Sequence, residues 1–205
     1  MTDRTTIAAV LFHEFELLDL FGPFEMFGLL PEQFELRLVA ESGDRVASAQ
    51  GPVSLIDHRF EDSPSFDLIL VPGGRGTRRE VDNPVMLEWL QAQAATANYV
   101  TSVCTGSALL ARAGLLDGLR ATTNKAAFEW VCSQGTNVDW QAKARWVEDG
   151  RFFTSSGVSA GMDMSLALIA KLLGEAQAEQ VATWSEYEWH RDPDWDPFAA
   201  VYGLA

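Results

Sequence analysis

Short aliphatic and β-branched runs alternate along the chain with longer segments of helical periodicity. The short runs predict strands at residues 7–12, 34–40, 67–71, 99–103 and 152–155. The periodic segments predict helices at residues 17–30, 84–97, 105–113, 126–133, 160–173 and 175–188. This alternation predicts an α/β fold with a doubly wound, mostly parallel sheet sandwiched between helices.

Local signals add detail to this pattern. The run at residues 67–71 is continuously apolar after its first residue, as expected of a parallel strand covered on both faces. Pro84 suits the first turn of its helix, and Asn83 before it is expected to cap that helix. Residues 148–151, Glu-Asp-Gly-Arg, predict a hairpin turn.

The length and composition favour one globular domain. The chain has 205 residues, of which 47% are hydrophobic and 21% charged. We expect a single α/β domain over residues 1–190 and an ordered extension over residues 191–205 that packs on the domain or on a partner subunit. The net charge of −14 disfavours binding to nucleic acid or to an anionic membrane. No pattern of a signal peptide or membrane span is present, so a cytoplasmic protein is expected.

Cys104 follows the predicted strand 99–103 and precedes a Thr-Gly-Ser stretch that opens a helix. A side chain at such a turn is exposed at the top of the sheet, as in a nucleophile elbow. The helix N-terminus is expected to stabilise a thiolate and lower the pKa of the thiol. On this pattern alone Cys104 is either a nucleophile or a small buried apolar residue. Cys132 lies on a predicted helix and fits the buried role better.

Two further motifs follow predicted strands. In Val-Pro-Gly-Gly-Arg-Gly-Thr, Gly73 and Gly74 are expected to leave backbone N–H groups free for an anion or oxyanion, unless the motif is only a tight turn. Its glycine spacing does not match a dinucleotide-binding fingerprint. Asp19 lies in the apolar start of a predicted helix. It is either a buried carboxyl with a raised pKa, suited to proton transfer, or a helix cap.

The histidines do not indicate a catalytic pair or a metal site. His13, His58 and His190 are distant from Cys104 in sequence. No set of His, Asp and Glu residues has the spacing of metal ligands. We therefore expect neither a metal nor another cofactor.

Together these motifs resemble the ThiJ/PfpI superfamily. The resemblance extends from about Thr6 to Glu188, through LLDLFGPFEMF, LILVPGG, YVTSVCTGSALLARAGLLDG, RATTN and TSSGVSAGMDMSLALI. The most similar branch is that of the isocyanide hydratases, which shares the TSVCTGS and LDLxGP patterns. Those enzymes add water to an organic isocyanide and give an N-substituted formamide. The resemblance implies a flavodoxin-like fold, similar to the class I glutamine amidotransferases, in a homodimer with a small-molecule substrate.

The resemblance also implies roles for individual residues. Cys104 is the expected nucleophile, carrying a thioimidate, and Asp19 is its acidic partner, where most branches have glutamate. Thr105 borders the site with its hydroxyl group and backbone. The N–H of Thr105 and the turn at Gly73 and Gly74 are expected to form an oxyanion-type pocket.

The chain departs from its relatives at two positions. Thr105 follows the cysteine where the PfpI peptidases have histidine, so a Cys–His peptidase lacks its base. Asn124, followed by Lys125, stands where the glyoxalase branch and the hydratase have histidine. Asparagine can hydrogen-bond a substrate but cannot carry a proton at neutral pH. The side chains expected to shape the pocket are Phe12, Phe15, Phe21, Arg75 and Asn124.

Other functions are compatible with a reactive cysteine. One alternative is a redox or electrophile sensor in which Cys104 is oxidised. Another is glyoxalase or deglycase activity on methylglyoxal, which Asn124 disfavours. A non-catalytic ligand-binding domain ranks lower. AraC-type regulators resemble this fold and append a helix-turn-helix region, but no basic recognition helix is indicated here, so we expect no DNA binding.

Overall fold

A seven-stranded sheet lies at the centre of the computed structural model, which describes residues 4–204. Its strand order is β10-β11-β7-β6-β1-β2-β5, and all neighbours pair in parallel except β10 and β11. The strands are β1 (Thr5–Leu11), β2 (Phe34–Ala40), β5 (His58–Arg59), β6 (Leu68–Val71), β7 (Tyr99–Val103), β10 (Trp146–Asp149) and β11 (Phe152–Ser155). The predicted α/β fold with a mostly parallel sheet is confirmed.

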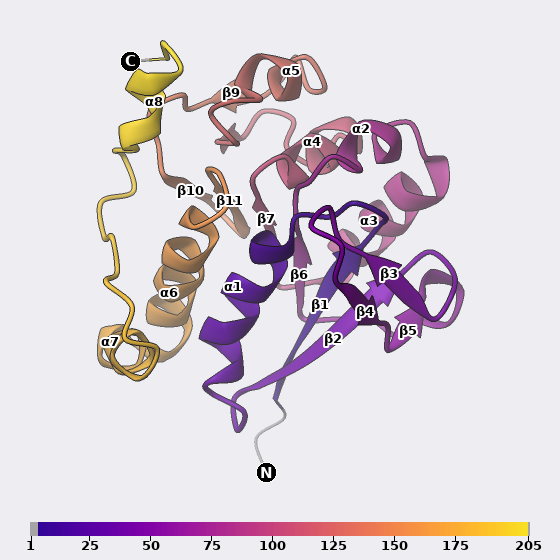
Figure 1. Ribbon diagram of the computed structural model, residues 1–205, viewed down its shortest axis with the longest axis horizontal. Coiled ribbons are helices and arrows are strands. Elements are labelled where there is room, and N and C mark those ends of the chain that lie inside the picture. Colours follow the sequence, from indigo (N-terminus) through magenta and orange to yellow (C-terminus); the bar gives the residue numbers. More distant parts are fainter. Residues whose placement is uncertain (1–3, 205) are drawn as a thin grey trace.

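Helices cover both faces of the sheet (Figure 1). One face carries α1 (Leu17–Gly28), α6 (Ala160–Leu173) and α7 (Glu175–Trp184). The opposite face carries α2 (Thr77–Glu80), α3 (Pro84–Thr96) and α4 (Gly106–Arg112), with α5 (Phe128–Cys132) beside α4. The remaining elements are the ladder of β3 (Arg45–Ala47) with β4 (Val53–Leu55), that of β8 (Arg120–Ala121) with β9 (Asp139–Trp140), the 3-10 turn Phe60–Asp62, and α8 (Pro197–Val201).

The structure contains every predicted strand and helix, with differences at their ends. The helix predicted at 17–30 ends at Gly28, and the one predicted at 175–188 ends at Trp184. The Asn83 cap is confirmed, because its side chain accepts a hydrogen bond from the Val85 N–H at 3.1 Å. The hairpin turn is confirmed between β10 and β11. No helix in the described part of the chain is long and apolar enough to cross a membrane.

The parallel strands place several chain turns along one edge of the sheet. The carboxyl ends of β1, β6, β7 and β11 all reach this edge, because these strands run in the same direction. Asp19 follows β1, Gly73 follows β6 and Cys104 follows β7. Ligands of open α/β sheets bind at this edge, so the topology brings the candidate residues to the expected place.

The first residue of α4 makes a close approach to the central sheet. A Cβ atom on Gly106 would lie 2.1 Å from the Val71 carbonyl oxygen at the end of β6. The Val71 carbonyl is a backbone group of β6, so no side-chain rotation can relieve this contact. Only glycine allows α4 to start this close behind Cys104.

Replacing Gly106 with alanine is therefore expected to lower the free energy of unfolding by about 3 kcal/mol, the upper range for overpacking a core. Gly118→Ala is the matched control, since Gly118 has a φ of +75° but no atom within 4 Å of an added Cβ. Only the left-handed backbone penalty of about 1–2 kcal/mol applies there. Urea denaturation of both variants measures the difference, and equal losses would mean that the approach to Val71 relaxes without cost.

Candidate functional site

Cys104 occupies a strained turn between β7 and α4. Its φ of +56° lies in the left-handed region that residues other than glycine rarely adopt. Such strain costs about 1–3 kcal/mol and persists where the surroundings enforce it. Here the Cys104 N–H donates to the Ser155 and Ser156 carbonyls at 3.2 and 3.0 Å, and its carbonyl accepts from Thr123 Oγ1 at 2.9 Å. These bonds fix the sharp strand-to-helix turn that the sequence predicts.

The Cys104 thiol is almost completely buried, with 7% of the residue exposed. Burial and the negative charge of Asp19 raise the pKa of the thiol well above its ordinary value. The N–H groups of Thr105 and Val158 face the sulfur and act in the opposite direction. The predicted lowering of this pKa is therefore wrong, because burial and the neighbouring carboxyl outweigh the backbone N–H groups.

Asp19 is the third residue of α1 and is fully buried. Its Oδ2 accepts a hydrogen bond from the Gly73 N–H at 2.9 Å, and its Oδ1 has no hydrogen-bond partner among the described residues. Burial and the charge of Glu16 raise the pKa of Asp19 to about 8, against the opposing effects of Gly73 and Cys104. Asp19 therefore holds a proton at neutral pH beside the thiol. The alternative role as a cap is excluded, since Glu16 is the N-cap and Asp19 binds a different loop.

The glycine turn after β6 binds the site residues rather than presenting free donors. The Gly73 N–H is donated to Asp19, and the Gly74 N–H is donated to Thr105 Oγ1 at 3.0 Å. The Gly73 carbonyl accepts from the Glu16 N–H at 2.8 Å, which ties the start of α1 to the turn. The expectation that these glycine N–H groups stand free for an oxyanion is therefore not met. The donors that face the sulfur are Thr105 and Val158.

Thr105 is positioned by its side chain as well as by its backbone. It is 4% exposed, and its Oγ1 accepts from the Thr77 hydroxyl group at 3.1 Å in addition to Gly74. These contacts hold the Thr105 N–H toward the Cys104 sulfur. Val158 was not predicted, and its only signal is its place just after the strand at 152–155. It has a φ of +47°, so the loop before α6 is also strained at the site.

Asn124 contributes to a cavity of about 220 Å³ that also has Val158 in its wall. Its Oδ1 accepts from the Ala127 N–H at 3.0 Å. Three of the other predicted pocket residues lie elsewhere. Phe15 is fully buried in the core, Phe12 lines a different cavity with His13, and Phe21 lines a surface cavity on α1. Within residues 4–204, no group of three or more His, Cys, Asp or Glu residues offers a metal site.

Comparison with known proteins gives a consistent result. A model of the DJ-1/PfpI family matches residues 5–171. An isonitrile hydratase from Pseudomonas putida is 39% identical over 181 residues, which cover 88% of this chain and 78% of that protein. The transcriptional regulator GbdR of Pseudomonas aeruginosa is 31% identical over 157 residues, which cover 77% of this chain but 42% of the regulator.

A solved structure agrees with these sequence matches. A ThiJ/PfpI family protein from Pseudomonas syringae superposes with a TM-score of 0.84 at 32% identity, covering 91% of this chain and 76% of that one. The fold and the range of the family match therefore agree with the resemblance found in the sequence. The chain belongs to the DJ-1/PfpI family.

Proposed function

We propose that the protein is a cysteine-dependent hydro-lyase that adds water to an organic isocyanide and gives an N-substituted formamide. One observation carries the proposal: a buried carboxyl, Asp19, holds a proton against the buried thiol of Cys104. Hydration of an isocyanide needs a nucleophile and a proton at the same carbon, and this pair supplies both. The 39% identity to an isonitrile hydratase supports the same reaction.

In the first step the Cys104 sulfur forms a bond to the terminal carbon of the isocyanide. Asp19 gives its proton to that carbon and takes the proton that the thiol loses. The product is a thioimidate, R–N=CH–S–Cys104, and Asp19 is again protonated. The Thr105 and Val158 N–H groups stabilise the negative charge that develops on sulfur during this exchange.

In the second step water adds to the thioimidate carbon. Asp19 gives its proton to the imine nitrogen and takes one from the water, which leaves R–NH–CH(OH)–S–Cys104. The carbon–sulfur bond then breaks, and the hydroxyl proton returns to the sulfur through Asp19. The formamide R–NH–CHO leaves with the thiol and the carboxyl in their starting states.

All proton transfers in this scheme use Asp19. Asn124 lies in the cavity wall next to the site, and its amide does not exchange protons at neutral pH. The resemblance implies histidine at this position both in the glyoxalase branch and in the hydratase. The proposed hydration needs only one proton carrier, so it is compatible with asparagine there.

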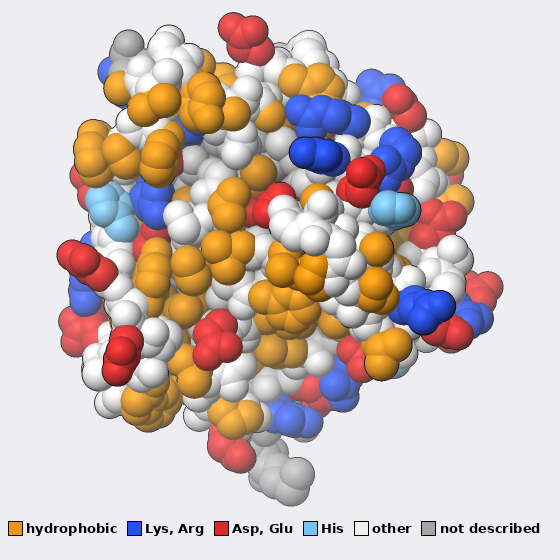
Figure 2. Space-filling view, in the orientation of Figure 1, with side chains coloured by type: hydrophobic (Ala, Val, Ile, Leu, Met, Phe, Trp, Pro, Cys, Tyr) orange, Lys and Arg blue, Asp and Glu red, His pale blue; other side chains and the backbone are white. Residues whose placement is uncertain are grey.

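We also propose that the protein is a homodimer, as the resemblance implies. Hydrophobic side chains gather on the face that carries α1 (Figure 2). Leu18 and Phe21 on α1 are each 41% exposed, beside a surface cavity whose wall also includes Pro52. A contiguous apolar patch of this kind is typical of an interaction surface. Light scattering is expected to give twice the chain mass of 22.6 kDa, and a monomer at micromolar concentration contradicts the proposal.

Replacing Asp19 with asparagine is expected to lower kcat by about 10²–10⁴-fold, the usual contribution of a general acid–base. Cys104→Ala is expected to abolish turnover, and Cys132→Ser is the control that keeps the wild-type rate. The measurement is formamide production from ethyl isocyanide, with heat-treated protein as the blank. A wild-type rate in Asp19→Asn would contradict the proposed role of Asp19 as the proton carrier. No turnover by the wild-type protein, with rapid alkylation of Cys104, would indicate a thiol that serves another electrophile.

The raised pKa of Asp19 also predicts how stability depends on pH. In the unfolded chain its pKa is near the ordinary 3.8, whereas in the folded protein it is about 8. Between these values the folded protein binds the extra proton, so the contribution of Asp19 to stability is complete below pH 4 and is lost as pH rises to 8. Relative to Asp19→Asn, the wild-type protein is expected to lose about 1.4 kcal/mol per pH unit between pH 5 and 7.

Urea denaturation of both proteins at pH 5, 6 and 7 tests this expectation. Comparing the two proteins removes the effects of the other titrating groups, which they share. Parallel curves of unfolding free energy against pH would show that Asp19 is already ionised in the folded protein at pH 5.

A further inference from the structure

The cavity beside the nucleophile is built from segments that are far apart in the sequence. It is lined by residues 124–126, by residues 156–159, and by Phe198 and Tyr202 near the C-terminus. Two residues of the cavity wall lie against the Cys104 turn. The Ser156 carbonyl accepts from the Cys104 N–H at 3.0 Å, and the Val158 N–H faces the Cys104 sulfur. The cavity therefore borders the turn that carries Cys104.

Two aromatic rings form the outer wall of the cavity. Phe198 and Tyr202 are four residues apart, so they lie on the same side of α8 and its last turn. They are 52% and 53% exposed, which leaves a large apolar surface uncovered at the cavity. A helix that served only to pack against the body would bury such rings. Their position at the rim instead suits contact with an apolar group of a ligand.

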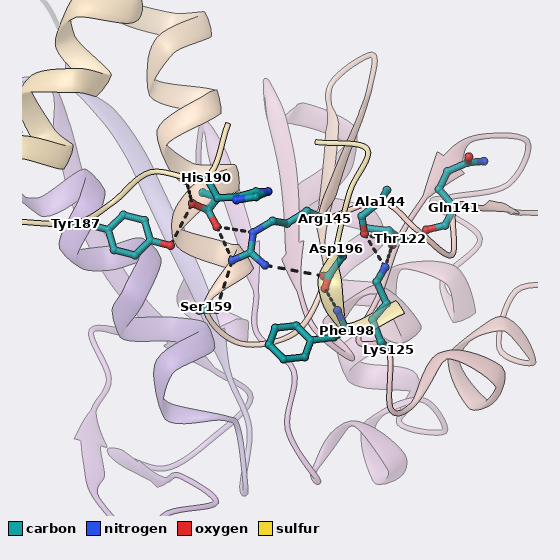
Figure 3. A network of polar contacts seen from close by, with 11 residues as sticks. Thr122, Lys125, Gln141, Ala144, Arg145, Ser159, Tyr187, His190, Asp196 and Phe198 are labelled. Carbon is teal, nitrogen blue, oxygen red and sulfur yellow. Dashed lines mark hydrogen bonds and ion pairs between the residues drawn. The ribbon is translucent and has the colours of Figure 1, made fainter. Parts of the chain in front are cut away.

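A buried acidic residue anchors α8 in this position (Figure 3). Asp196 is 3% exposed and caps α8, since its Oδ1 accepts from the Phe198 N–H at 2.9 Å. Its backbone N–H donates to the Lys143 carbonyl at 2.8 Å. Its Oδ2 has no hydrogen bond among the described residues and lies 4.0 Å from Arg145 Nη1. The start of α8 is thus held to the rest of the protein by one ion pair and one backbone hydrogen bond.

Arg145 connects this anchor to the opposite wall of the cavity. It is 8% exposed and binds Asp163 of α6 at 2.7 Å. Its Nη2 lies 3.5 Å from the hydroxyl group of Ser159, which lines the cavity. Its backbone N–H donates to the Pro193 carbonyl at 2.7 Å. Arg145 therefore holds the C-terminal segment through its backbone N–H and its ion pair with Asp196, and it holds the loop that carries Val158 through its contact with Ser159.

Lys125 contributes an apolar stem to the cavity rather than a free cation. Its Nζ donates to Thr122 Oγ1 at 2.8 Å and to the Ala144 carbonyl at 2.6 Å (Figure 3). The residue is 3% exposed, so these bonds direct its charged end into the body of the protein. The cavity therefore combines aromatic rings and aliphatic carbon with the polar amide of Asn124.

We propose that α8 determines the substrate specificity of the Cys104 site, with Phe198 and Tyr202 binding the organic substituent of the substrate. This inference rests on the proposed isocyanide hydration, whose reacting carbon bonds to Cys104. The volume of about 220 Å³ is below the range of about 300–1,000 Å³ for drug-sized ligands, so the cavity fits a small apolar group such as a benzyl ring. Asp196 is a positioning residue that acts through α8.

The test compares ethyl isocyanide with benzyl isocyanide. Phe198→Ala and Tyr202→Ala are each expected to raise KM for the benzyl substrate at least about 10-fold, within the range for losing contacts in an apolar pocket. The kcat for both substrates and the kcat/KM for ethyl isocyanide are expected to change less than 2-fold, because the reaction centre is untouched. Asp196→Asn is expected to shift the benzyl-to-ethyl ratio in the same direction, and Tyr202→Phe is expected to keep the wild-type ratio.

Val201→Ala is the matched control on the same helix. Val201 is 71% exposed and does not line the cavity, so its removal is expected to leave both substrates unaffected. Circular dichroism confirms that each variant is folded. A benzyl-to-ethyl ratio that is unchanged in Phe198→Ala and Tyr202→Ala overturns the role of α8, while turnover of both substrates leaves the proposed hydration intact.

A second measurement separates the cavity from the reaction. In a Cys132→Ser background, N-benzylmaleimide and N-ethylmaleimide probe the reaction of Cys104 with the same two substituents. The wild-type site is expected to react relatively faster with the benzyl reagent, and Phe198→Ala is expected to lose this preference at least about 10-fold. If no isocyanide is hydrated but this preference and its loss are observed, the proposed function fails and the substituent site stands. If the preference is absent, the substituent site fails.

Discussion

A methyl group added to Gly73 would come within 2.6 Å of the Thr105 nitrogen and 2.8 Å of Asp19 Oδ2. This close approach allows one backbone residue to hold the acid, through its N–H, while its carbonyl fixes the start of α1 at Glu16. The neighbouring Gly74 N–H holds the Thr105 side chain. The glycine turn thus sets the distance between Asp19 and the turn that carries Cys104 and Thr105. The rest of the site depends on this spacing, because proton transfer requires contact between the two groups.

Burial keeps both Asp19 and the Cys104 thiol in their neutral forms. An ionised carboxyl without full hydrogen bonding is costly in an apolar interior, so Asp19 keeps its proton at neutral pH. The thiol of Cys104 is also neutral at rest, because burial opposes its ionisation as well. In the proposed reaction the N–H groups of Thr105 and Val158 therefore interact more strongly with the sulfur as negative charge develops on it. Stabilisation that appears in the transition state rather than in the resting protein accelerates the chemical step.

Local patterns account for what could be predicted from the sequence. Strand and helix periodicity predicted the sheet, and the turn at Cys104 was visible because a strand, a cysteine and a helix start are consecutive. The hydrogen bond from the Gly73 N–H to Asp19 could not be predicted, since the two residues are 54 positions apart in sequence and only the tertiary fold brings them together. The predicted lowering of the Cys104 thiol pKa was wrong for the same reason, because burial by segments distant in sequence raises that pKa. The five-residue helix α8 is too short for a periodic signal, and its place depends on the contact of Asp196 with Arg145.

The boundary of the family match separates two parts of the site. Cys104, Asp19 and Thr105 lie within residues 5–171, whereas Phe198 and Tyr202 lie outside this range. Proteins that share the matched region include a hydratase and a transcriptional regulator, so this region alone does not determine function. In the proposed scheme the strand ends supply the reaction, and a segment anchored through Arg145 supplies the surface that recognises the substituent. In this scheme specificity and reaction are separable, because the two rings lie on a different segment from the sulfur and the carboxyl.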